Sequence, residues 1–215
     1  MGDIVLFGRY PQSDDETTEP IQWRILEIDN VNHKMLLLSE YVLDSQQYHD
    51  TSITWADSSL RTWLNNDFMT AAFTATEQAK ILTTSLTNPD NPFSGTSGGI
   101  DTNDKVFLLA LSDVFGENSH YIDGYWYFNN NKDRKAMATF YAVIKGVNAY
   151  NFGTSSSCST TNFEINKCSA LWWLRSPGLS AGKAACVRND GYVSGDGCAI
   201  FYSLAGVRPA LWVNY

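Results

Sequence analysis

Four cysteines, all in the last third of the chain, are the side chains with the widest potential for chemistry. They are Cys158, Cys168, Cys186 and Cys198. Two disulfides are possible, and free, partly buried thiols are an equally open alternative, because a chain of 215 residues does not need covalent staples. A Cys-x-x-Cys or Cys/His spacing does not occur, so the sequence gives little support to a zinc site.

A reactive cysteine usually has a basic neighbour or a helix start that lowers its pKa. Arg188 lies two residues after Cys186, on the same face if this segment is a strand, and Cys198 follows Gly197 at a predicted turn. Neither context is specific. We therefore expect structural or incidental roles for these thiols.

One oxygen-rich segment could hold a cation. Residues 101–104 offer three oxygen ligands in a Gly-rich loop, and calcium prefers such oxygens. The terminal Glu of a full calcium loop is missing, so we expect an Asx-rich turn before a strand and no cofactor. The histidines, His33, His49 and His120, stand alone in polar contexts that are typical of a protein surface.

Sequence motifs of the common enzyme classes do not occur. The chain has no GxSxG, HExxH or P-loop, and no GxGxxG after a strand. No pair of carboxylates stands out as an acid and a base. We therefore expect that this protein is not an enzyme.

The composition indicates one folded domain and argues against two classes of partner. A hydrophobic fraction of 44% is ample for a packed core in residues 1–215. A net charge of −8 with scattered basic residues argues against nucleic acid. Apolar runs such as residues 106–111 are too short for membrane insertion. The first residues do not resemble a secretory signal, and location and oligomeric state stay open.

The elements that must position these residues begin with strands. Short apolar runs predict strands over residues 3–7, 21–29 and 34–38. Helical spacing follows over residues 57–65, and Thr74 to Glu77 fits a capping box that starts a helix running to residue 82.

The second half mixes both element types. We predict a surface loop over residues 88–103, a buried strand over 106–111, a short helix at 112–115 and a helix over 134–145. From residue 171 onward, short apolar runs alternate with Gly-centred turns, which is typical of hairpins. The sum is an α+β fold with a mixed or antiparallel sheet, a few helices and long irregular loops.

The C-terminal stretch joins two rigid ends to an adaptable middle. Its ends are WWLRSPG and GVRPALW, and the run between them is dominated by Gly, Ala, Ser, Cys, Asp, Asn and Tyr. We predict that the ends are paired strands, in which Arg175 and Arg208 hold carboxylates or backbone carbonyls. The middle then forms a binding surface on a fixed scaffold.

Together with FGRYPQ, PIQWRIL, LLLSEYVLD, SSLRTWLNNDF and DKVFLLALSDV, these ends resemble a family of C-type-lectin-like domains from Firmicutes and their phages. The resemblance covers nearly the whole chain and is most specific at the C-terminus. Some members are variable proteins of diversity-generating retroelements. They share the fold of formylglycine-generating enzymes and use it to display a mutable, C-terminal ligand-binding surface. The resemblance therefore implies a C-type-lectin-like fold and a binding function.

Diversification in such proteins replaces template adenines, so that varied codons never encode Trp, Met, Gln, Glu or Lys. Residues 177–205 contain no Trp, Met, Gln or Glu, and Lys183 would be templated. The resemblance thus implies a variable region over about residues 179–205, with the glycines, Val187, Val193 and Ile200 as its frame. The predicted ligand-binding residues are Leu179, Ser180, Lys183, Cys186, Arg188, Asn189, Tyr192, Ser194, Asp196, Cys198, Phe201, Tyr202, Ser203 and Leu204.

We expect a protein or a cell-surface molecule as the ligand. One alternative is a structural or assembly domain of the same fold that is not diversified. Another is a formylglycine-type oxidase that uses Cys186 or Cys198. Such an oxidase would need a closely spaced cysteine pair holding copper, and these two cysteines are well apart, with no partner His.

Overall fold

The N-terminal strands form an antiparallel sheet that the C-terminus completes. A computed structural model describes the chain apart from residues 1, 14–16, 116–126, 129 and 152–155. The sheet order is β1-β2-β3-β15. Its strands are β1 (Ile4–Pro11), β2 (Thr18–Asp29), β3 (Lys34–Ser39) and β15 (Ala210–Asn214). The three predicted N-terminal strands are confirmed, each with a slightly longer extent.

One helical segment runs without a break from Ser59 to Ala72, and the spacing of apolar residues predicts its first part. Ser58 caps it by accepting a hydrogen bond from the backbone N–H of Arg61. Leu60, Leu64 and Phe68 are all buried, at intervals of four residues that keep them on one side of the helix. The helical segment begins and ends later than the predicted range of residues 57–65. Its consecutive parts are α1 (Ser59–Trp63), the π-helical η2 (Leu64–Phe68) and α2 (Met69–Ala72), preceded by the 3-10 turn η1 (Trp55–Asp57).

The capping box at Thr74 and Glu77 is present, with both reciprocal hydrogen bonds. The helix that it starts, α3 (Ala75–Gln78), is shorter than predicted. The predicted extension to residue 82 is wrong because the chain turns into the sheet edge, where Ile81 bridges Val213. Tertiary pairing here overrides a local helical pattern.

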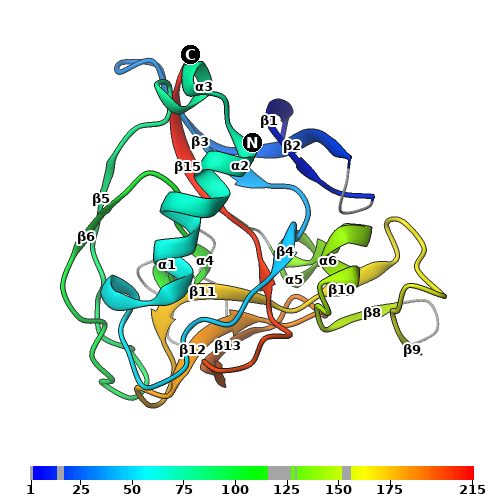
Figure 1. Cartoon of the computed structure of the whole chain (residues 1–215). Helices are drawn as coiled ribbons and strands as arrows, with labels where there is room; N and C mark the ends of the chain where they lie inside the picture. The colour runs from blue at the N-terminus through cyan, green and yellow to red at the C-terminus, as the bar shows by residue number, and fades with distance from the viewer. Residues whose placement is uncertain (1, 14–16, 116–126, 129, 152–155) are drawn as a thin grey trace.

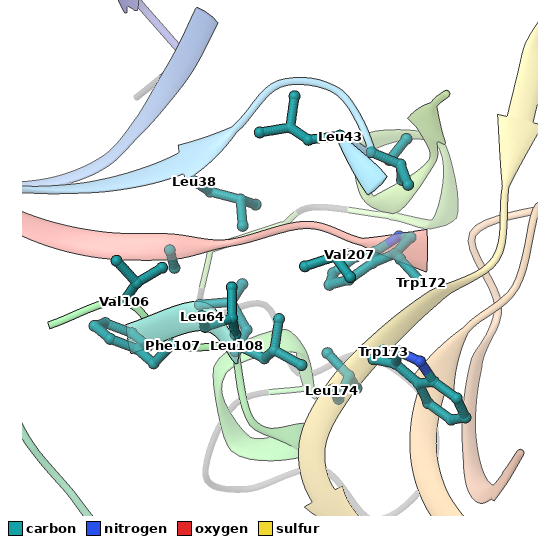
Figure 2. Packing of buried hydrophobic residues seen from close by; sticks show 14 of the residues in the cluster. Leu38, Leu43, Leu64, Val106, Phe107, Leu108, Trp172, Trp173, Leu174 and Val207 are labelled. Carbon is teal, nitrogen blue, oxygen red and sulfur yellow. The ribbon is translucent and has the colours of Figure 1, made fainter. Parts of the chain in front are cut away.

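Residues 106–111 are buried, as predicted, but they are not a strand. Phe107 makes one bridge to Ala210 and no ladder follows. The carbonyls of Leu108 and Leu109 instead accept hydrogen bonds from Arg175. The segment lies among the residues of the core cluster (Figure 2). The short helix that we predicted next is present as α4 (Leu111–Phe115).

The single helix predicted over residues 134–145 is wrong. The chain forms α5 (Asn131–Arg134), the strand β7 (Ala136–Met137) and then α6 (Phe140–Ile144). Thr139 caps α6 through the backbone N–H of Ala142, so a new helix begins there. The strand between the two helices pairs with β10 (Cys168–Ala170) in the sheet β7-β10-β8-β9.

The middle of the chain adds several short strands. Two of them, β5 and β6, pair only with each other. The disulfide between Cys158 and Cys168 joins the end of β9 to β10. These elements are β5 (Thr84–Leu86), β6 (Thr102–Asp104), β8 (Ala149–Asn151) and β9 (Ser156–Ser157).

The C-terminal stretch builds a five-stranded mixed sheet in the order β13-β12-β11-β14-β4. The predicted pairing of the two rigid ends is confirmed only at one point, where β11 runs parallel to β14 with Trp172 opposite Gly206, because the second end continues into β15 and pairs there with β3. This sheet lies toward the opposite end of the molecule from both chain ends (Figure 1). Its strands are β4 (Asp44–Ser45), β11 (Trp172–Pro177), β12 (Lys183–Val187), β13 (Val193–Ala199) and β14 (Gly206–Val207).

The whole is an α+β fold made mostly of strands, with a few short helices and a curled antiparallel sheet. Within the described part of the chain, no helix is long and apolar enough to cross a membrane.

Candidate functional site

We define the frame as residues 172–178 and 206–212, and the display segment as residues 179–204. Trp172 and Trp173 of the frame are fully buried. Their ring N–H groups donate to the carbonyls of Arg134 at 3.2 Å and Gln46 at 2.9 Å. Buried indole N–H groups that are satisfied in this way hold both rings in fixed positions.

The two arginines of the frame act as predicted. Arg208 is fully buried, donates to the carbonyl of Ser39 at 2.9 Å and lies 5.0 Å from the ring centre of Trp172. Arg175 donates to the carbonyl of Leu108 at 2.8 Å and pairs with Asp113 at 2.9 Å. Because each guanidinium group joins segments that are far apart in sequence, the frame is tied to the core on several sides.

Most of the predicted ligand-binding residues lie on the surface. Phe201 is 62% exposed, Tyr192 52% and Tyr202 49%, values that are high for large apolar side chains. Asn189, Ser194 and Cys198 are half-buried. The remaining exposed members are Leu179, Ser180, Lys183, Arg188, Asp196, Ser203 and Leu204.

One predicted surface residue is wrong. Cys186 is fully buried in β12, the strand between β11 and β13, and it cannot meet a ligand from solvent. Its predicted companion Arg188 lies beyond the end of β12 and is exposed. The predicted frame positions Val187, Val193 and Ile200 are all buried, which confirms that part of the division.

Glycines shape the turns of the display segment. Gly191 has a φ of +84°, and a side chain there would lie 1.8 Å from the carbonyl oxygen of Asn131. At Gly195 a side chain would meet the ring of Phe93 at 2.5 Å. Both positions therefore need glycine for close approach, and Gly191 also needs it for its backbone conformation.

The first hollow has a volume of about 330 Å³ and lies beside Tyr192 and Asp196. Phe93 and Phe115 meet edge to face across it at 6.2 Å. Arg188 lies 6.0 Å from the centre of the Tyr192 ring. The residues that line the first hollow are Phe93, Phe115, Asn131, Arg134, Tyr192, Val193, Gly195 and Asp196.

The second hollow has a volume of about 210 Å³ and is almost entirely apolar. Cys198, Tyr202 and Leu204 of the display segment contribute to it. Ala199 of the same segment lines it as well, and Asn148, Leu171 and Ala205 complete it from outside the segment. The predicted binding surface therefore contains one mixed and one apolar concavity, which suits a ligand with both kinds of group.

A third hollow, of about 180 Å³, lies away from the display segment. Tyr41, Phe140 and Phe163 supply its aromatic walls, and Gln12 and Glu19 contribute polar groups. None of the predicted ligand-binding residues lines it.

The sequence pattern did not identify the residues that distant segments bring to the site. Asn91 belongs to the predicted surface loop but is 1% exposed, and it donates to the carbonyls of Pro177 and Gly195 at 2.8 and 2.9 Å. Phe93 follows it and walls the first hollow. A polar loop with a single aromatic residue carries no local sign of such a role.

The four cysteines divide into one disulfide and two thiols. Cys158 and Cys168 are bonded, while Cys186 and Cys198 are free. The free pair lies on the neighbouring strands β12 and β13, where Cys198 pairs with Ala184, two residues before Cys186. The expectation that these two cysteines are well apart is therefore wrong in space, because strand pairing brings together residues that are twelve positions apart.

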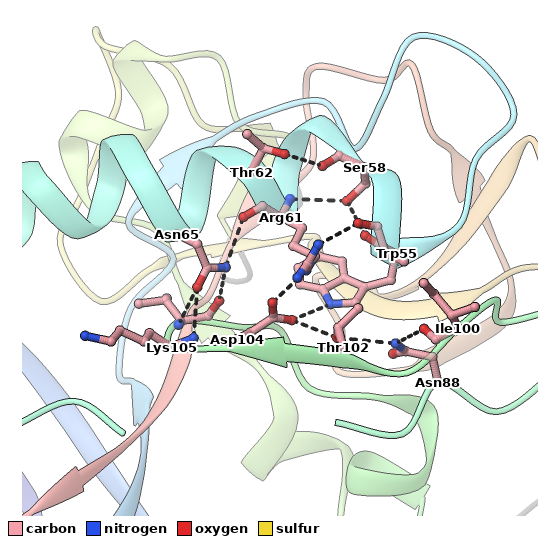
Figure 3. Close-up of polar contacts among 12 residues, drawn as sticks. Trp55, Ser58, Arg61, Thr62, Asn65, Asn88, Ile100, Thr102, Asp104 and Lys105 are labelled. Atoms are coloured by element: carbon pink, nitrogen blue, oxygen red, sulfur yellow. Dashed lines mark hydrogen bonds and ion pairs between the residues drawn. The ribbon is translucent and has the colours of Figure 1, made fainter. Parts of the chain in front are cut away.

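Within residues 101–104, Thr102 and Asp104 use their side-chain oxygens inside the protein (Figure 3). Asp104 is buried and pairs with Arg61 at 2.6 Å, and it also accepts hydrogen bonds from Trp55 and Thr102. Asp101 accepts the backbone N–H of Asn88. The segment is the strand β6 and not the predicted turn before a strand.

Potential metal ligands do not gather elsewhere in the residues that the structure describes, where no group of three His, Cys, Asp or Glu is found. His33 contacts the ring of Tyr215, and His49 accepts the backbone N–H of Ser59. His120 lies outside the described residues.

Comparison with known proteins gives a family and no relative of known role. No curated protein and no solved structure matches the chain. A family model with the description "Domain of unknown function (DUF6273)" matches residues 32–215, which include the frame, the display segment and all four cysteines. The chain therefore belongs to the DUF6273 family.

Proposed function

We propose that this protein binds a protein or cell-surface ligand through the display segment, on a C-type-lectin-like fold related to that of formylglycine-generating enzymes. The observation that carries the proposal is the exposure of Tyr192, Phe201, Tyr202 and Leu204 within a short stretch of chain. Contiguous exposed apolar side chains mark interaction sites on soluble proteins. Tyr beside Ser and Arg is also the composition of selected binding surfaces.

We also propose that a diversity-generating retroelement varies the display segment. The division into a buried frame and an exposed segment supports it, because changes at exposed positions leave the core intact. Lys183, which the diversification rule excludes, stands at the first position of β12. The decisive observation is the neighbouring DNA. A reverse transcriptase gene and a near-identical repeat that differs at adenines are expected, and the absence of both would refute diversification.

Binding itself can be tested with labelled protein on intact bacterial cells. We expect saturable binding that is reduced at least about tenfold in the double variant Tyr192→Ser with Tyr202→Ser, because large aromatic anchors dominate interface energies. The matched control is Val31→Ser with Ile100→Ser, two exposed apolar residues outside the display segment. Equal binding by both double variants would contradict the proposal.

The alternative of an assembly domain rests on the same exposed residues, which could pack on another chain. Sedimentation of the variant Tyr192→Ser with Phe201→Ser and Tyr202→Ser separates the two functions. Loss of an oligomer without loss of cell binding favours assembly, and loss of cell binding by a protein of unchanged mass favours recognition. We propose recognition without catalysis.

A further inference from the structure

The two free cysteines lie on neighbouring strands, and Cys198 lines the second hollow. Ala184 pairs with Cys198 and Cys186 pairs with Ser194, with a register shift between these pairs. The shift accommodates extra residues in β13 and brings Cys198 diagonally toward Cys186. Cys186 is fully buried, whereas Cys198 is half-buried and lines the hollow. A reagent from solvent therefore meets Cys198 first.

The surroundings of the two sulfur atoms differ in a way that separates their chemistry. The hydrogen bond from the Cys186 thiol lowers the pKa of Cys198, burial opposes this, and the charges of Arg188 and Lys183 add to the lowering. The same hydrogen bond, together with burial, raises the pKa of Cys186. Cys198 is thus the sulfur that becomes a thiolate, and Cys186 stays a thiol that donates to it. An accessible thiolate beside a second cysteine is the arrangement of thiols that react reversibly with oxidants.

We propose that Cys198 and Cys186 form a thiol–disulfide exchange site that takes low-molecular-weight disulfides, with Cys198 as the attacking sulfur and Cys186 as the resolving sulfur. This site goes beyond ligand recognition and does not depend on it. Cys198 lines the second hollow together with the apolar side chains of Leu171, Tyr202 and Leu204. It can therefore be reached from the same face of the protein as the proposed ligand.

The reaction balances with oxidised glutathione as the oxidant. The Cys198 thiolate attacks one sulfur of the disulfide, forms a mixed disulfide and releases one glutathione thiolate. The Cys186 thiol then loses its proton and attacks the Cys198 sulfur, which releases the second glutathione. The two protein sulfurs lose two electrons and two protons, and the disulfide gains them as two thiols. The product is a Cys186–Cys198 disulfide that covalently joins β12 to β13.

The test is intact-mass spectrometry with peptide mapping after exposure of the full chain to oxidised glutathione. Wild type is expected to lose two hydrogens without a lasting adduct. Cys186→Ser should accumulate one glutathione on Cys198, and Cys198→Ser should react at least about tenfold more slowly than wild type, because its remaining thiol is buried. A stable adduct on wild type, or equal reaction of Cys198→Ser, would overturn the proposal.

Two further measurements keep the test independent of folding and of ligand binding. Near-ultraviolet circular dichroism checks that the serine variants, or the corresponding alanine variants, retain the native core. In Lys183→Met with Arg188→Met, the pH at which Cys198 reacts with iodoacetamide should rise, because two cations that favour the thiolate are gone. An unchanged pH profile would contradict the part that these two charges have in favouring the Cys198 thiolate. None of these readouts involves the cell-surface ligand.

Discussion

The frame and the display segment each contribute two strands to the five-stranded sheet but carry opposite physical constraints. Every residue of β11 is buried, so its side chains are fixed by packing. Residues 201–204 of the display segment are all exposed, although two aromatic residues are among them. The burial of a residue in the folded chain, and not its hydrophobicity, therefore decides whether it is free to change. Cys186 makes this clear, because it belongs to the display segment in sequence and to the core in space.

The largest expected effect comes from removing a ring of the frame. Trp172→Ala should lower the free energy of unfolding by about 3–5 kcal/mol, because it leaves a cavity and removes the contact with Arg208. Urea denaturation followed by circular dichroism measures it. Trp63→Ala, at a half-buried position of α1 outside the frame, is the control and should cost clearly less. Equal losses would mean that the frame is no more constrained than this helix.

An intermediate effect is expected at the turn of the display segment. Gly191→Ala should cost at least about 2 kcal/mol, because the left-handed backbone and the close carbonyl of Asn131 both oppose a side chain. Gly182→Ala is the matched control, since its nearest neighbour is a hydroxyl 3.7 Å away and no strained φ is involved. Thermal denaturation of the two variants should separate them by several degrees. Similar melting temperatures would show that the turn can rearrange.

The smallest effect on stability is expected on the exposed face. Phe201→Ser with Tyr202→Ser should change the free energy of unfolding by less than about 1 kcal/mol, because neither side chain is buried. The same urea denaturation measures it. A larger loss would place these rings in the core and break the distinction between the frame and the display segment.

Sequence patterns were reliable where local chemistry decides the outcome. The capping box at Thr74, the strand β2 and the roles of Arg175 and Arg208 follow from neighbours along the chain or from one strong preference. They failed where pairing with distant segments decides. Residues 134–145 divide because β10 captures a strand from their middle. Cys186 is buried because β11 and β13 enclose it on both sides.

The site shows the same limit. Exposure of most of the display segment could be predicted, because small and polar residues surround its rings. The walls of the hollows could not, because Phe93, Leu171 and Asn148 come from segments with no pattern in common. The contact between the two free thiols depends on a register shift that no spacing along the chain reveals.

The parallel pairing of Trp172 with Gly206 has a consequence for chain length. It closes residues 173–205 into one loop, which contains the rest of β11 and the whole display segment. Loop-closure entropy grows with the logarithm of length, and doubling a loop costs only about 0.6 kcal/mol. That is less than the roughly 0.8 kcal/mol lost with one buried methylene group. Insertions at the turns of the display segment should therefore be tolerated, so its surface can vary in size and reach as well as in amino-acid type.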